Sequence, residues 1–268
     1  MPEHIIFAPD SELDGLWWLR LDRPDARNAY SMEMVDGLCQ VLTQATLDDA
    51  VHAVILTGQG SAFSAGGDLK AMREHAGMFA GAPVELRTRY QEGIHRIPKR
   101  IASFDKPLLA AVNGPAIGAG LDLACMCDIR IAARSARFGS TFVRVGLIPG
   151  DGGAYFLTRT VGFPRALELV MSGRVIDTDE ALRIGLVGTV VEDEDLEAAA
   201  RKQAERLLRG SPLAVRMAKR LCYRSYEASQ EVALELAASY QGMVQNTADH
   251  DEAVAAMLDR RRPVFKGE

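Results

Sequence analysis

Three glycine-rich segments carry most of the residues that could do chemistry in this chain. Each contains an aspartate and runs into a helical pattern, and they span residues 58–72, 110–128 and 142–162. Glycine permits a positive φ and lets a ligand approach the backbone closely. Because the free N–H groups at a helix start favour anionic oxygen, such segments can offer both hydrogen-bond donors and a carboxylate.

The first segment, GQGSAFSAGGDLKAM, follows a strand-like run that ends at Gly58. Asp68 is a good residue to cap the helix that begins beside it. The amides from Gly67 to Leu69 would then point out of a helix start. Taken alone, the segment indicates little, because a glycine-rich turn before a helix is structural more often than functional.

The other two segments carry the acids of greatest interest. Asp122 falls in the first turn of an apolar helix, where it is either an acid favoured by the helix dipole or a partly buried general acid/base. Asp151 is surrounded by glycines and could simply cap a following helix. Considered together, the first two segments could aim two N–H donors at one point, which is an oxyanion hole suited to a thioester oxygen becoming an enolate.

Short β-rich runs alternate with helical patterns over the first two-thirds of the chain, which predicts parallel strands with crossover helices. Strands are expected at 15–22, 53–58, 108–114, 128–133 and 187–192. Helices are expected at 31–49, after the N-cap Ser31, and at 85–104, where Pro98 should kink or interrupt the helix. From about Glu194 the sequence is nearly all helix-forming.

Composition narrows the classes of function. The chain has 268 residues, 48% of them hydrophobic and 25% charged, with a net charge of −5. These values describe a globular protein, and no basic run suggests nucleic-acid binding. No apolar stretch is long enough to cross a membrane, and the N-terminus lacks a signal-peptide pattern, so we expect a cytoplasmic protein. The four cysteines and five histidines form no metal-ligand motif, so no metal is expected.

The sequence resembles the crotonase (enoyl-CoA hydratase/isomerase) superfamily over nearly its whole length. The matching motifs, in order, are LDRPDARNAYS, AFSAGGDLKAM, AAVNGPAIGAGLDLACMCDIRIAA, FGSTFVRVGLIPGDGG, SGRVIDTDEALRIGLV and the tail RRRPVFKGE. The resemblance implies an α/β fold, a spiral of ββα units over residues 1–195, followed by a C-terminal helical trimerisation region over 196–268. It also implies a homo-oligomer, either a trimer or a hexamer, that acts in acyl-CoA or fatty acid metabolism. Coenzyme A would be part of the substrate, and no separate cofactor is implied.

The resemblance also assigns individual positions. Gly67 and Ala119 match the two amides of the family's oxyanion hole. Positions that match the lining of the CoA path are Asp25, Ala26, Ala65, Asp68 and Leu69. Lys266 falls in a C-terminal stretch that can approach the nucleotide end of CoA in relatives.

The acids depart from the family pattern. A typical hydratase has two glutamates, and here Asp122 occupies one of their positions while Phe142 occupies the other. Hydration of a 2-enoyl-CoA is best served by two acids, whereas a double bond can be moved by one base. Asp122 is the first choice for that base and Asp151 the reserve, while Phe142 suggests an apolar wall. The family favours hydration and the residues favour isomerisation, so both reactions stay open.

Three further classes of function are alternatives to a catalytic member of this family. The missing second glutamate fits an acyl-CoA-binding homologue with little or no catalysis. A nucleotide-binding oxidoreductase is disfavoured because the glycine spacing differs from G-x-G-x-x-G. A serine hydrolase is disfavoured because no G-x-S-x-G occurs and Ser64 has no identifiable histidine partner.

Overall fold

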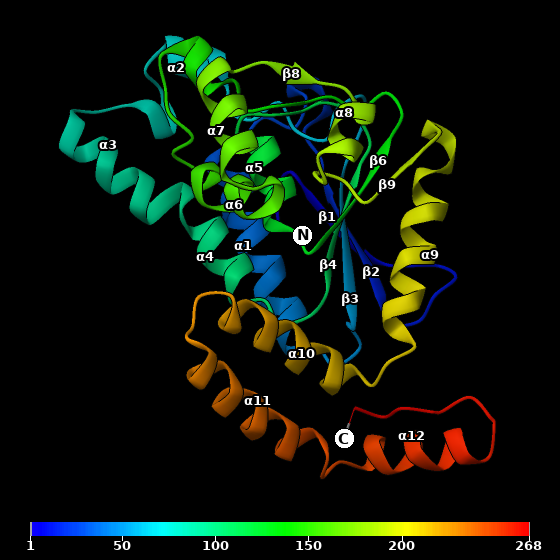
Figure 1. Ribbon diagram of the computed structural model, residues 1–268. Helices are drawn as coiled ribbons and strands as arrows, with labels where there is room; N and C mark the ends of the chain where they lie inside the picture. The colour runs from blue at the N-terminus through cyan, green and yellow to red at the C-terminus, as the bar shows by residue number, and fades with distance from the viewer. Residues whose placement is uncertain (1, 268) are drawn as a thin grey trace.

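A twisted, mainly parallel sheet forms the centre of the computed structural model, which describes residues 2–267 (Figure 1). Within those residues, six strands lie in the order β1 (Ile5–Pro9), β2 (Leu16–Leu21), β3 (Ala53–Gly58), β4 (Leu108–Val112), β6 (Ile129–Ala133) and β9 (Thr189–Val191). β1 runs antiparallel to β2, and the other neighbours are parallel. In the same part of the chain, a smaller sheet consists of β5 (Ala116–Ile117), β7 (Phe138–Gly139) and β8 (Val175–Ile176).

Burial on both faces explains why the central strands are continuous apolar runs. All six residues of β3 are buried. Val54 and Leu56 belong to the larger core beneath α1, whereas Ala53 and Ile55 belong to a second core beneath α9. Helices on both faces of a parallel sheet remove the alternation of polar and apolar residues that a half-exposed strand would show.

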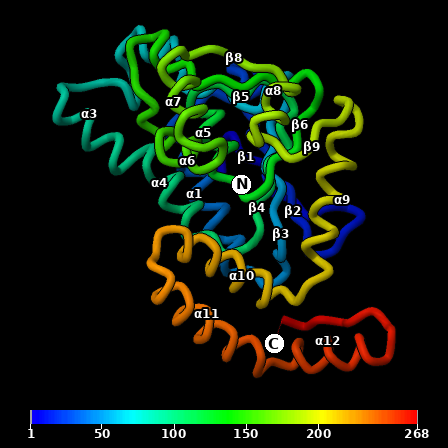
Figure 2. Tube along the Cα trace, viewed as in Figure 1, coloured from blue at the N-terminus to red at the C-terminus, as the bar shows by residue number. Residues whose placement is uncertain are grey.

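The helices divide into those of the body, which contains this sheet, and those of a C-terminal arm. The first group comprises α1 (Met32–Leu47), α2 (Leu69–Arg73), α3 (Pro83–Arg89), α4 (Arg96–Ala102), α5 (Ala119–Met126), α6 (Gly153–Val161), α7 (Phe163–Ser172), α8 (Thr178–Arg183) and α9 (Leu196–Leu208). An arm beyond them consists of α10 (Pro212–Ser225), α11 (Gln230–Val244) and α12 (Ala248–Leu258). Figure 2 shows the chain passing from the body into this arm after α9.

The five predicted strands are confirmed as β2, β3, β4, β6 and β9, and α1 begins after Ser31, whose side chain accepts the N–H of Met34. The interruption predicted in the 85–104 helix is confirmed, and it is a π-helical turn, η3, over Tyr90–Ile94. Pro98 lies in the first turn of α4 and cannot donate to the carbonyl of Ile94, four residues before it, which is the last residue of η3.

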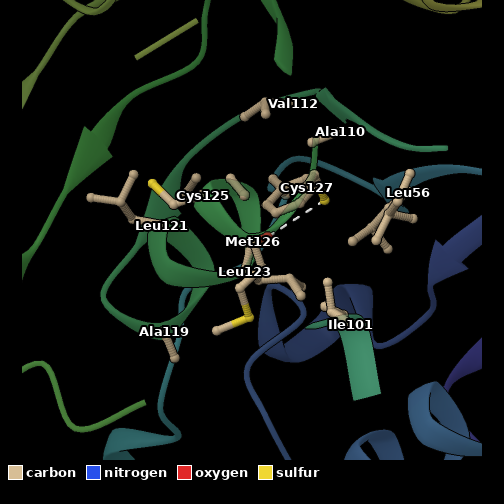
Figure 3. Packing of buried hydrophobic residues seen from close by; sticks show 14 of the residues in the cluster. Leu56, Ile101, Ala110, Val112, Ala119, Leu121, Leu123, Cys125, Met126 and Cys127 are labelled. Carbon is tan, nitrogen blue, oxygen red and sulfur yellow. Dashed lines mark hydrogen bonds between the residues drawn. The ribbon is translucent and has the colours of Figure 1, made fainter. Parts of the chain in front are cut away.

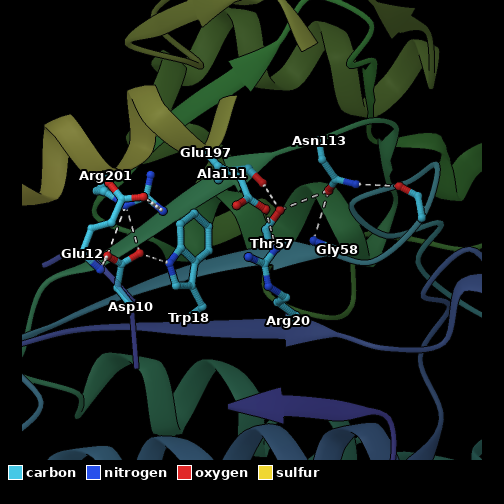
Figure 4. Close-up of polar contacts among 11 residues, drawn as sticks. Asp10, Glu12, Trp18, Arg20, Thr57, Gly58, Ala111, Asn113, Glu197 and Arg201 are labelled. Carbon is cyan, nitrogen blue, oxygen red and sulfur yellow. Dashed lines mark hydrogen bonds and ion pairs between the residues drawn. The ribbon is translucent and has the colours of Figure 1, made fainter. Parts of the chain in front are cut away.

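Helix α9 lies within the region predicted to be C-terminal, but it packs against the sheet. Leu196 and Ala200 share the second core with Trp18 of β2. The Trp18 indole Nε1 donates to Asp10 at 2.7 Å, and Arg201 Nε donates to the same carboxylate at 3.0 Å (Figure 4). This network ties the N-terminal hairpin to α9.

Helix α5 lies at the centre of the larger core, where Leu121, Leu123 and Met126 surround its axis (Figure 3). Cys125 lies on this helix and Cys127 is its C-cap. Both are buried thiols, and burial raises the pKa of each to about 12. They therefore act as small apolar side chains at neutral pH, as the sequence predicts.

Leu56→Ala should lower the free energy of unfolding by about 2–5 kcal/mol, because it leaves a cavity in a side-chain layer that is buried on both sides. Leu47→Ala is the matched control: Leu47 is 78% exposed, and its loss should change stability by about 0.5 kcal/mol or less. Urea unfolding at one protomer concentration measures both. Equal losses would contradict the assignment of Leu56 to the core.

Candidate active site

Two loops that follow neighbouring parallel strands meet at one edge of the sheet. The first loop, after β3, is held from below by the buried side chain of Asn28, whose Nδ2 donates to the carbonyls of Gln59 at 3.0 Å and Ala62 at 2.8 Å. Ser64 Oγ donates to the Asn28 carbonyl at 2.8 Å and accepts the N–H of Gly66 at 3.1 Å. The path of this loop is therefore fixed by Asn28, which comes from a distant segment of the chain, and by the loop's own Ser64.

Backbone hydrogen bonds join this loop to the second one, which follows β4. Ser64 N donates to the Pro115 carbonyl at 3.1 Å, and Ile117 N donates to the Ser64 carbonyl at 3.0 Å. Gly66 has φ of +81°, and a Cβ on it would overlap the carbonyl oxygen of Ile117 and lie 3.0 Å from the nitrogen of Ala119. The two backbones are so close that only glycine fits at residue 66.

The amide of Gly67 follows Gly66 in the first loop, and the amide of Ala119 lies in the second loop next to the contact with Gly66. Within residues 2–267, neither N–H donates to a protein acceptor. Ala119 is the first residue of α5, so its N–H is one of the groups that a helix leaves unpaired at its start. Two free donors are therefore held on adjoining loops.

A cavity of about 260 Å³ opens beside these loops. Its wall includes Gly67 of the first loop, Gly118 of the second, and Asp151. The rest of the lining is mostly apolar: Ala65, Leu69, Met72, Met78, Phe79, Tyr90, Ile94, Ile117, Thr141, Phe142, Arg144, Val145 and Leu147. Such a cavity suits a hydrocarbon group with one polar end.

Of the described side chains that line this cavity, Asp151 carries the only carboxylate. It is 6% exposed, and its Oδ1 has no hydrogen-bond partner within the described chain. Burial raises the pKa of Asp151 to about 6, and the nearby imidazole of His95 acts in the opposite direction. A carboxyl group with this pKa can both accept and release a proton near neutral pH.

Asp122 is the neighbouring acid, but it does not line the cavity. It is 0% exposed, and its Oδ2 accepts the N–H of Gly153 at 3.0 Å. Burial and the adjacent charge of Asp151 raise the pKa of Asp122 well above its usual value. The two acids named from the sequence thus lie close together, with only Asp151 at the cavity wall.

Of the other residues predicted from the sequence, some line the cavity and one caps a neighbouring helix. Ala65, Leu69 and Phe142 line the cavity with Gly67. Asp68 caps α2 through its side chain and forms an ion pair with Arg23 at 3.2 Å.

The remaining predicted positions lie outside the cavity wall. Asp25 and Ala26 lie on the short 3-10 helix η1 (Pro24–Ala26). Lys266 lies in the tail beside α12, where its backbone N–H donates to Asp249 at 2.7 Å. In Figure 1 this tail is at the opposite end of the molecule from α2.

Sequence analysis missed Tyr90 and His95. Tyr90 lines the cavity, and the His95 ring Nε2 lies 2.7 Å from the carbonyl oxygen of Gly150, next to Asp151. Both residues fall in the helix predicted at 85–104. The π-helical turn η3 determines their positions, and Pro98 is the sequence signal for an interruption there, although it does not show which side chains the turn brings to the cavity.

A parallel sheet with a ligand site at one edge is shared by many enzymes, and comparison with known proteins identifies the family. A family model described as enoyl-CoA hydratase/isomerase matches residues 12–268. A probable enoyl-CoA hydratase of Mycobacterium bovis is 35% identical over 92% of this chain and 93% of that protein. The 1,2-epoxyphenylacetyl-CoA isomerase of Escherichia coli is 34% identical over 95% of this chain and 96% of that protein.

Solved structures support the same family assignment. The crystal structure of an enoyl-CoA hydratase from Bacillus anthracis superposes with a TM-score of 0.92 at 33% identity, covering 99% of this chain and 100% of that one. The chain therefore belongs to the crotonase superfamily of enoyl-CoA hydratases and isomerases.

Within residues 2–267, no helix combines the length and apolar character that a membrane span requires. Histidine, cysteine and acidic side chains in the same residues form no group of three or more that could hold a metal ion.

Gly66→Ala should destabilise the chain more than Gly77→Ala. Both glycines have positive φ, so an alanine at either position should cost about 1–2 kcal/mol of backbone strain. At residue 77 a Cβ meets nothing within 4 Å, whereas at residue 66 it must also push the second loop away. Urea unfolding measures the difference, and equal losses would contradict the close contact of the two loops.

Proposed function

We propose that this chain moves a carbon–carbon double bond in an enoyl-CoA thioester, with Asp151 as the proton-transferring base. The observation that carries the proposal is the single carboxylate among the described residues that line an apolar cavity. Gly67, whose amide is unpaired, lines the same cavity, and the unpaired amide of Ala119 follows the lining residue Gly118. The proposed site consists of Gly67, Ala119 and Asp151.

The N–H groups of Gly67 and Ala119 would bind the thioester oxygen. That oxygen gains negative charge when a proton leaves the α-carbon, because the carbanion is delocalised as an enolate. Fixed donors stabilise this charge without reorganising, and one such donor typically contributes a factor of about 10²–10³ in rate. The dipole of α5 adds to the effect because Ala119 is at the helix start.

Ionised Asp151 would carry the proton. For a 3-enoyl thioester, its carboxylate takes a proton from C2, and the electrons delocalise over the thioester oxygen and C4. The same carboxyl group then returns the proton to C4, which leaves the double bond between C2 and C3. No water, metal ion or redox partner is consumed, so the step balances with one acid/base.

Hydration is the second candidate, supported by relatives that are named as hydratases. It requires a water to be held and deprotonated while a proton is delivered to the α-carbon, and two acids do this best. Asp122 is withdrawn from the cavity and Phe142 offers no acid, so we place isomerisation first. An acyl-CoA-binding homologue without catalysis is the remaining alternative.

Coenzyme A would enter as part of the substrate, along the path predicted at Asp25, Ala26, Asp68 and Leu69. We also propose a cytoplasmic homo-oligomer. Large apolar side chains on the arm are exposed, among them Met257 at 81% and Leu258 at 79%, as expected of a surface that a second copy covers. In such an assembly Lys266 would meet a nucleotide bound to another subunit.

Matched 2-enoyl and 3-enoyl thioesters test the reaction, with products followed by mass and by double-bond position. The wild type should interconvert the two, and Asp151→Asn should lose about 10²–10⁴-fold in kcat. Asp14→Asn, at an exposed acid, is the control. A gain in mass equal to one water would favour hydration, and no conversion in a broad panel would favour simple binding.

The pH profile of kcat/KM should show an acidic limb near pH 6. Below the raised pKa of Asp151, at about 6, the carboxyl group is protonated and cannot accept a proton, so the rate falls as the pH falls. A limb near pH 4, the ordinary range of an aspartate, would contradict the role given to this buried acid.

Ala119→Pro should lower kcat by about 10²–10³-fold, because it deletes one donor to the thioester oxygen. Proline is well tolerated at the first position of a helix, and the preceding residue is a glycine with no Cβ to clash. Ala119→Gly keeps the N–H and serves as the control, with melting temperatures to exclude misfolding. Full activity in a folded proline variant would rule out this donor.

A further inference from the structure

The turn that carries Asp151 is held from both sides by side chains of other elements. His95 Nε2 donates to the carbonyl of Gly150 at 2.7 Å, and Asp122 Oδ2 accepts the N–H of Gly153 at 3.0 Å. These contacts fall on the residue before Asp151 and on the second residue after it. Three of the four residues of the turn are glycine, so the turn has little stiffness of its own.

We propose that His95 and Asp122 are positioning residues that clamp residues 150–153 and thereby aim the Asp151 carboxylate into the cavity. The inference rests on the proposed function, because it concerns the base of that reaction. It also gives Asp122, the first choice for proton transfer from the sequence, a different role.

The π-helical turn η3 brings His95 to this position. The His95 N–H donates to the Tyr90 carbonyl at 2.9 Å, five residues back, as in a widened turn. One residue turns an α-helix by about 100°, so closing this turn to a regular helix would rotate His95 away from Gly150. The Tyr90 ring packs edge-on against His95, with ring centroids 5.9 Å apart, and lies beside Gly150.

The contact with Gly150 also defines the proton on His95. A carbonyl oxygen can only accept, so Nε2 must carry hydrogen in this contact. When both ring nitrogens are protonated, the positive charge lowers the pKa of Asp151 against the effect of burial. The other titratable groups that interact with Asp151 are Asp122 from α5, Tyr30 before α1 and Tyr90 from η3.

The contact of Asp122 with the start of α6 is equally specific. A Cβ on Gly153 would overlap Oδ1 of Asp122, so the carboxyl group lies directly against the backbone. Asp122 Oδ1 has no partner within the described residues and does not reach the cavity wall. The group is thus placed to hold a backbone N–H rather than to meet a substrate.

Pairs of variants separate holding from proton transfer. His95→Gln keeps an N–H at a similar reach, whereas His95→Leu removes it. Asp122→Asn keeps an oxygen that can accept from Gly153, whereas Asp122→Ala removes it. The leucine and alanine variants should lose about tenfold to a hundredfold in kcat with little change in KM, because a displaced base reacts slowly. The glutamine and asparagine variants should recover most of that loss.

His95→Gln provides a second readout. It removes the ring whose positive charge, when both nitrogens are protonated, lowers the pKa of Asp151, so the acidic limb of kcat/KM should move to higher pH while kcat on the plateau is largely kept. His250→Leu, on α12, is the matched control for the loss of a histidine. A purely structural role for His95 would leave the limb in place, and an unmoved limb would overturn its placement beside Asp151.

Failure of the proposed clamp and failure of the proposed isomerisation give different experimental results. If Asp122→Asn loses as much kcat as Asp122→Ala, Asp122 transfers a proton and the clamp is wrong. If the wild type hydrates instead of isomerising, the same variant pairs are compared on hydration. If the wild type converts nothing, crystal structures decide: residues 150–153 should be displaced in His95→Leu relative to the wild type, and an undisplaced turn would overturn the proposal.

Discussion

The backbone contact between the loops after β3 and β4 is the constraint on which the site depends. The two strands are parallel neighbours, so their carboxyl ends open at the same edge of the sheet, where α/β proteins bind ligands. Ser64 joins the loops by two backbone hydrogen bonds, and Gly66 lets them approach to van der Waals distance. That approach holds the unpaired amides of Gly67 and Ala119 on adjoining loops, and the amide of Ala119 is unpaired because it lies at the start of α5.

The two aspartates show how placement alone separates residues of one type. Asp122 and Asp151 are both buried, and burial raises the pKa of both. Asp122 is 0% exposed, and one of its carboxylate oxygens accepts a backbone N–H, whereas Asp151 lines the cavity. A shared hydrogen-bonded turn connects them, so the inner acid can determine the geometry of the outer one while remaining out of reach of a substrate.

Membership of the superfamily explains the scaffold but leaves the reaction to a few side chains. The relatives that match this chain over nearly its whole length include proteins named as hydratases and as an isomerase. By the family resemblance, the two positions that carry glutamates in a typical hydratase are Asp122 and Phe142 in this chain. Asp151 is the only carboxylate among the described residues that line the cavity, and on this basis we propose proton shuttling rather than the addition of water.

The sequence by itself determined the family, the parallel strands, the N-cap of α1 and the glycine-rich loops, because these depend on local patterns and motif order. It predicted Gly67, Ala65, Leu69 and Phe142, all of which line the cavity. Only the tertiary structure decided which aspartate faces that cavity, and it revealed His95 beside Gly150. The reason is physical: exposure and pKa depend on atoms brought from distant segments, and a π-helical turn changes the direction of a side chain without changing the local pattern of residues.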